Sequence, residues 1–143
     1  MLRNTNPVQT YKETQIKTAN QLKLVVMLYD GAIRHLNEAL DCIQAGHKKY
    51  DAFNRHIVAA QEILSELMGS LDFDKGGSLA KNLLSLYMFM NQRLLDANIQ
   101  KDVRLVEEVK KYLSDLREAW EQISNKKGVG EQATAKGGIN VAG

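Results

Sequence analysis

The sequence has 143 residues, and its hydrophobic content of 44% beside 25% charged residues is typical of a single globular domain with one buried core. Three lysines and one glutamate after Asn125 account for the net charge of +2, so the charges of residues 1–125 cancel. Without a basic face, nucleic acid is not an expected partner. One proline and 6% aromatic residues favour helices over a β-sandwich or barrel.

Cellular location is indicated only by what the sequence lacks. Cys42 is the single cysteine, so no intrachain disulfide can form and nothing indicates an oxidising compartment. The first residues lack the apolar core of a signal peptide, and no apolar run is long enough to cross a bilayer. We therefore expect a cytoplasmic protein with no membrane insertion.

The first helical pattern runs from about Asn20 to Ala45. Asn20 is a favourable N-cap, and Gly46 stands where a left-handed residue commonly ends a helix. The apolar positions alternate in steps of four and three, which is the seam of a helix packed in a bundle. They are Leu22, Val26, Tyr29, Ile33, Leu36, Leu40 and Ile43.

Three further segments carry the same spacing. The second runs from about Asp51 to Leu71, with the seam Phe53, Ile57, Ala60, Leu64, Leu67 and Leu71. Turn-forming residues 72–77 break the pattern, and a third segment begins at a Ser78 cap and ends near Asn98, with the seam Ala80, Leu83, Tyr87, Met90, Leu94 and Ala97. The fourth runs from near Asp102 to near Asn125, with Val106, Val109, Leu113, Leu116, Trp120 and Ile123. Each segment is too short to be a stable helix on its own, and the loops between the segments are short. We therefore predict an all-α fold, an antiparallel four-helix bundle.

The two ends of the chain lie outside this bundle pattern. Residues 1–18 are polar, with a few apolar positions, and form an N-terminal arm that could include a short helix after Pro7. Residues 126–143 are rich in glycine and small side chains without a period, so we expect a disordered tail. The predicted organisation is therefore a bundle domain with its arm over residues 1–125, and a flexible tail over 126–143.

The helices carry more apolar side chains than one bundle seam needs. The third segment is apolar almost all round, and Leu84, Met88 and Leu95 share one of its faces. One interpretation is a wider core. The other is an exposed groove for a partner helix, where methionines suit adaptable packing. The expected contact residues are Leu24, Met27, Leu28, Ile63, Met68, Leu84, Met88 and Leu95.

Tyr11 is the expected anchor of the N-terminal arm. The arm could lie in the apolar groove and leave when the partner arrives, or it could be a first helical turn packed permanently on the bundle. Both interpretations remain open at the level of the sequence.

No catalytic or metal-binding pattern is evident. None of the three histidines, His35, His47 and His56, follows a glutamate at the spacing of a carboxylate-bridged di-iron bundle. A second cysteine for zinc or haem is absent, as is a phosphate-binding glycine loop. We therefore expect no catalytic residues, no metal site and no cofactor, and a protein that is not an enzyme.

Several short motifs, taken together, resemble the flagellar export chaperone family FliS. Coverage is about residues 10–124. The resemblance rests on the run Gln21–Ile33 (QLKLVVMLYDGAI), on Ala60–Ile63, Glu66–Leu67 and Ser70–Asp72, on Asn82–Tyr87, Arg93–Leu94 and Ala97–Asn98, on Leu116–Trp120, and on Tyr11. We expect Tyr29, Asp30, Asn82, Arg93 and Asn98, which lie within these motifs, to form hydrogen bonds between helices.

The resemblance implies a chaperone that binds the C-terminal segment of new flagellin in the cytosol. Such a protein prevents early polymerisation and aids delivery to the flagellar type III export apparatus. The family fold is an antiparallel four-helix bundle, around which the flagellin segment wraps, and the N-terminal arm covers part of the site in the free form. The alternative function is a structural bundle that forms homo-oligomers, such as a homodimer, through the same apolar face.

Overall fold

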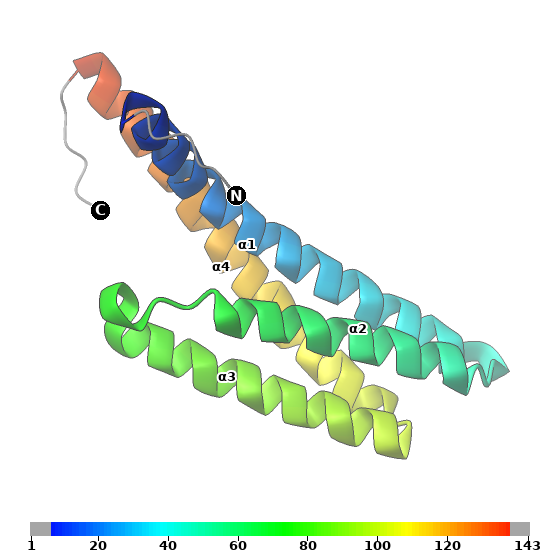
Figure 1. Cartoon of the computed structure of the whole chain (residues 1–143). Helices are drawn as coiled ribbons and strands as arrows, with labels where there is room; N and C mark the ends of the chain where they lie inside the picture. Colours follow the sequence, from blue (N-terminus) through cyan, green and yellow to red (C-terminus); the bar gives the residue numbers. More distant parts are fainter. Residues whose placement is uncertain (1–6, 138–143) are drawn as a thin grey trace. The chain divides into compact units, whose positions relative to one another are not determined.

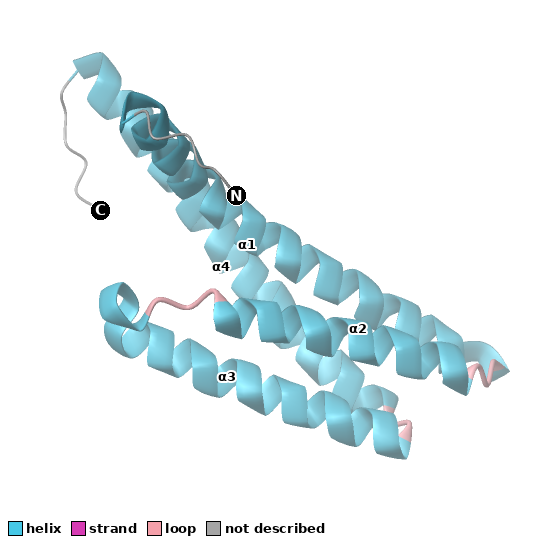
Figure 2. Cartoon of the chain, in the orientation of Figure 1, coloured by secondary structure: helices cyan, strands magenta, loops and turns pink. Residues whose placement is uncertain are grey.

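The computed structural model describes residues 7–137, with side chains described over 21–44 and 46–126. The described chain consists of α1 (Pro7–Ile43), a 3-10 turn (Gln44–Gly46), α2 (Tyr50–Gly69), α3 (Phe73–Gln100) and α4 (Val103–Gly137) (Figure 1). No strand occurs among these residues (Figure 2). The predicted all-α fold with four helices is confirmed.

The chain forms two compact units. The central unit is Leu28–Arg117, and the terminal unit combines Met1–Met27 with Glu118–Gly143. Both α1 and α4 contribute to both units, so the ends of helices do not mark the boundaries between units. The expected domain boundary after residue 125 stays a prediction.

The core of the central unit follows the seams expected from the sequence. All six seam residues of α3 and the first five of α2 are buried, as are Tyr29, Leu36 and Leu40 of α1 and Val106, Val109 and Leu113 of α4. Small side chains complete the α1 face, namely Ala32, Ala39 and Cys42. No polar or charged residue is buried among those whose side chains are described. Burial of this apolar surface is therefore the main stabilising contribution in the central unit.

The helix ends at both termini differ from the expected ones. α1 begins at Pro7 and passes through Asn20 without a break. Proline is well suited to the first position of a helix, and no glycine or second proline follows before Asn20 to stop propagation. At the other end, α4 continues past Asn125 to Gly137. Elongation of a nucleated helix needs no new nucleation, and Glu131, Gln132, Ala133 and Lys136 favour helix there, although Gly128 and Gly130 oppose it.

The turn between α2 and α3 matches the predicted break. Asp72 caps a short first turn, since its Oδ1 accepts hydrogen bonds from the backbone N–H groups of Asp74 and Lys75, both at 3.0 Å. Gly77 then interrupts α3 with φ +53° and ψ −128°, a conformation that side chains with a Cβ rarely adopt. The continuous part of α3 therefore starts at Ser78, the predicted cap position.

Polar motif residues connect helices at the surface of the central unit. Asp30 of α1 accepts a hydrogen bond at 2.6 Å from Nε of Arg117 in α4. Arg93 of α3 pairs with Glu108 of α4 at 3.0 Å. Asn98 donates to Asn54 of α2 at 2.6 Å. These contacts confirm the interhelical hydrogen bonds expected for Asp30 and Asn98, whereas Arg93 makes an interhelical ion pair and Asn82 is exposed.

Two tyrosine hydroxyls form a hydrogen bond inside the core. The oxygens of Tyr29 and Tyr87 lie 2.5 Å apart, with ring centroids at 6.5 Å, and both side chains are buried. Burial raises the pKa of Tyr87 above its ordinary value of 10.0, although the hydrogen bond with Tyr29 opposes this shift. The folded state therefore holds the phenolic proton more firmly than the unfolded chain does.

This pKa shift predicts a loss of stability in alkali. Below pH about 10, Tyr87 is neutral in both the folded and the unfolded protein. Above this pH only the unfolded chain releases the proton. The free energy of unfolding therefore falls as the pH rises toward the folded-state pKa. The Tyr87→Phe variant should lose stability less steeply above pH about 10 than the parent, measured by urea unfolding across the pH range. Tyr50→Phe, at a side chain that is 45% exposed, is the control and should keep the parental slope. Equal slopes for the parent and Tyr87→Phe would contradict this assignment.

Candidate partner-binding surface

α3 exposes a row of large apolar side chains along one flank. Met88 is 57% exposed, Leu95 44% and Ile99 72%, while Leu84 is half-buried. These four residues, called here the α3 stripe, lie on one face because they are separated by four, seven and four positions. Tyr87 and Leu94, on the neighbouring face of the helix, are buried. The stripe therefore lies beside the core seam and not within it.

Contacts between α2 and α3 show which neighbour the stripe borders. Gln61 donates to the backbone oxygen of Asn91 at 3.4 Å, and Asn98 donates to Asn54. From the first contact to the second, the residue number falls by seven along α2 and rises by seven along α3. Seven residues are about two helical turns, and the opposite signs show that the two helices are antiparallel. Two further turns in the same register place half-buried Met68 of α2 opposite Leu84. Met68 therefore extends the stripe onto α2.

Ile63 of α2 and Leu28 of α1 lie away from the α3 stripe, on the sides of these two helices that face each other. The Cδ1 atom of Ile63 lies 3.3 Å from the position that a Cβ on Gly31 would occupy, so Ile63 packs on α1 at this glycine. Leu28 is one helical turn before Gly31, on the same face of α1. Both side chains are half-buried. The expected contact residues of the central unit therefore form two groups, one between α1 and α2 and one along α2 and α3.

The remaining expected contact residues belong to the terminal unit. Leu24 is 55% exposed and Met27 65%, which is far more than a core position would allow. The backbone of Tyr11 is part of α1, but its side chain lies outside the described residues. Its role as the anchor of an arm stays a prediction.

The opposite flank of α3 is tied to α4. The ring of Phe89 meets that of Tyr112 edge-on at 6.1 Å between centroids. The guanidinium of Arg93 lies 4.9 Å from the centroid of the Phe89 ring, while its Nε pairs with Glu108. Phe89 is 40% exposed yet has partners on this side, so it is a weaker candidate for guest binding than the α3 stripe.

Besides Phe89, three exposed large apolar residues of α3 were not among the expected contacts, namely Phe73, Leu79 and Ile99. Ile99 is one turn beyond Leu95 on the same face, and Leu79, at 59% exposure, lies near the start of the helix. The step of four residues from Leu95 was the signal that could have identified Ile99.

No helix in the described part of the chain is long and apolar enough to span a membrane.

Comparisons with known proteins all give the same family. The family model described as "Flagellar protein FliS" matches residues 4–127. The flagellar secretion chaperone FliS of Salmonella typhimurium is 37% identical, with 82% of this chain and 87% of that protein covered. The chaperones of the same name from Bacillus subtilis and Vibrio cholerae are each 31% identical, covering 82% and 81% of this chain and 85% and 87% of their own lengths. The chain therefore belongs to the FliS family of flagellar proteins.

Proposed function

We propose that this protein is a cytoplasmic export chaperone that binds the C-terminal segment of flagellin. In this role it prevents premature polymerisation and aids delivery of the subunit to the flagellar type III export apparatus. Two observations support the proposal: membership of the FliS family, and the exposed α3 stripe beside a buried seam. The stripe carries the argument, because exposed apolar side chains in a row on one helix mark a site for another chain.

A helical guest with an apolar face suits this stripe. The side chains are aliphatic or thioether groups spaced along several turns of α3, which matches the spacing of anchors on an amphipathic helix. Met88 and Met68 can adjust their rotamers to a guest of variable sequence. The terminal segment of a filament subunit is such a guest, since its apolar face is covered only in the assembled filament.

The energetics require a longer track than the stripe alone. Burying one Leu, Ile or Met side chain contributes about 1.5–3 kcal/mol, whereas ordering a disordered segment costs about 2–5 kcal/mol and association costs more. We therefore propose that the guest also covers the group between α1 and α2, which includes Leu28 and Ile63, and the exposed Leu24 and Met27. For the N-terminal arm, with Tyr11, to cover part of this track in the free protein, residues 7–20 would have to leave the helical path of α1.

Size exclusion with light scattering tests the function. The protein is mixed with a peptide from a flagellin C-terminus, and a one-to-one complex is the expected result. The alternative, a structural bundle that assembles through its apolar face, predicts a self-dimer that is unchanged by the peptide. A monomer that ignores the peptide would contradict both functions.

A further inference from the structure

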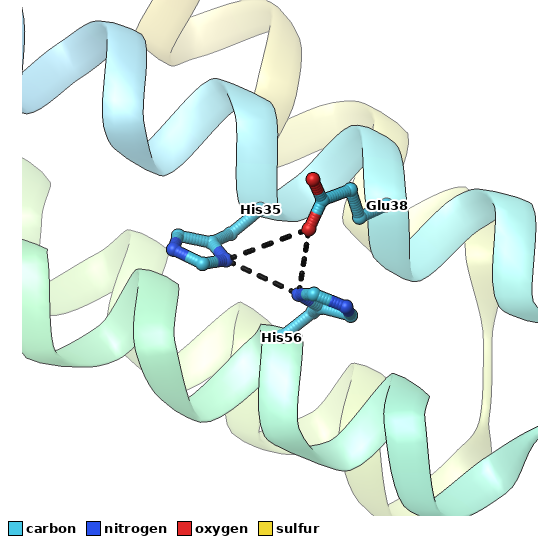
Figure 3. A group of neighbouring side chains, drawn as sticks. All are labelled: His35, Glu38 and His56. Carbon is cyan, nitrogen blue, oxygen red and sulfur yellow. Dashed lines mark hydrogen bonds and ion pairs between the residues drawn. The ribbon is translucent and has the colours of Figure 1, made fainter.

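Three side chains with metal-binding atoms converge between α1 and α2, in the central unit (Figure 3). Nδ1 of His35 lies 3.1 Å from Nδ1 of His56, which is 3.0 Å from Oε2 of Glu38. The same carboxylate oxygen is 4.0 Å from Nδ1 of His35. The ligand atoms of both rings and the carboxylate therefore point toward one another.

These separations fit a tetrahedral metal ion. Zinc bonds of about 2.0–2.1 Å to nitrogen and oxygen at tetrahedral angles place neighbouring ligand atoms about 3.3 Å apart. The observed values of 3.0, 3.1 and 4.0 Å lie on both sides of this spacing, so small rotamer adjustments would bring all three atoms into range. Two imidazoles and a carboxylate are also a donor set that suits zinc, with water as the fourth ligand.

The accessibility of the group also suits an ion. The side chains of His35 and His56 are 27% and 26% exposed, and that of Glu38 is 46% exposed. Both rings are thus held largely within the protein, while the carboxylate side remains open for a hydrated ion to enter. The approach is also electrostatically favourable, because the carboxylate carries the negative charge.

We propose that His35, Glu38 and His56 bind a zinc ion that links α1 to α2. Without metal, the Nδ1–H group of His56 can donate to Oε2 of Glu38 and to the unprotonated Nδ1 of His35. Zinc needs the lone pairs of both Nδ1 atoms, so on binding the His56 proton moves through solvent to Nε2, and the ion connects both rings and the carboxylate directly. The two helices are then held together next to the place where Ile63 packs on Gly31. Zinc binding at these three residues does not require flagellin, and its test uses none.

Isothermal titration of the untagged full chain with zinc chloride, after treatment with a chelator, tests the site. The expected result is one zinc per chain and a melting temperature that rises with added zinc. His35→Gln and His56→Gln should each lower the zinc affinity at least tenfold and abolish the rise in melting temperature. His47→Gln, at an exposed residue outside the cluster, is the matched control and should bind zinc as the parent does.

Cobalt(II) spectroscopy identifies the ligands. The cluster predicts visible bands of four-coordinate cobalt without a thiolate charge-transfer band, and these bands should be unchanged in Cys42→Ser. If a glutamine variant of either histidine does not fold, Glu38→Gln makes the same test at a more exposed side chain. No zinc binding, equal affinity in the cluster variants and the His47→Gln control, or a spectrum that depends on Cys42 would each overturn the proposal.

Discussion

Met88→Asp is expected to weaken binding of a flagellin C-terminal peptide by about tenfold or more while the free protein keeps its helical content. Met88 is 57% exposed, so an aspartate there is solvated in the free protein. In the complex the substitution removes about 1.5–3 kcal/mol of apolar burial and desolvates a carboxylate, and each 1.4 kcal/mol is a factor of ten in affinity. Fluorescence anisotropy of a labelled peptide measures the affinity, and circular dichroism measures the helical content.

A matched control separates the loss of apolar contact from the added charge. Ala119→Asp introduces the same charge at an exposed position of α4 outside the α3 stripe, and should change the affinity less than twofold. Equal losses in both variants would point to a general electrostatic effect. Unfolding of Met88→Asp would show that Met88 belongs to the core, and the stripe would then not be a binding site.

The core was predictable because burial in a bundle follows helical spacing. Once Tyr87 and Leu94 of α3 were assigned to a seam, the steps of four and three identified their buried neighbours. Helix ends were less predictable, because Asn20 favours a cap yet costs less than about 0.7 kcal/mol inside a helix that began earlier. The structure has α1 begin at Pro7, where the main-chain angle already suits a helix.

The candidate site was only partly predictable, because a surplus of apolar residues does not reveal which neighbour each one faces. Ile63 and Met68 are both surplus positions of α2, yet Ile63 packs on α1 while Met68 lies opposite Leu84 of α3. The register between helices decides this, and no local pattern records it. The histidines were unpredictable for the same reason. Their spacing along the sequence indicated no metal site, but the packing of α1 on α2 brings His56 close to His35.

Adjacent residues of α3 offer a direct test of where the core ends and the binding surface begins. Leu94 is fully buried, whereas Leu95 is 44% exposed. Leu94→Ala removes buried methyl groups and opens a cavity among well-packed neighbours, so it should lower the free energy of unfolding by about 2–5 kcal/mol. Leu95→Ala should lower it by less than about 1 kcal/mol, since its side chain is only partly buried and leaves no enclosed cavity. Urea unfolding followed by circular dichroism measures both values.

Peptide binding should show the opposite order for the two alanine variants. Leu95→Ala removes about 1–2 kcal/mol of contact with the guest, a loss of roughly 5- to 30-fold in affinity. Leu94→Ala, measured at a temperature where it is fully folded, should bind within about threefold of the parent, because Leu94 faces the core. If Leu95→Ala lowered the free energy of unfolding more than Leu94→Ala, the α3 stripe would be part of the core. Normal binding by Leu95→Ala would mean that the guest lies elsewhere.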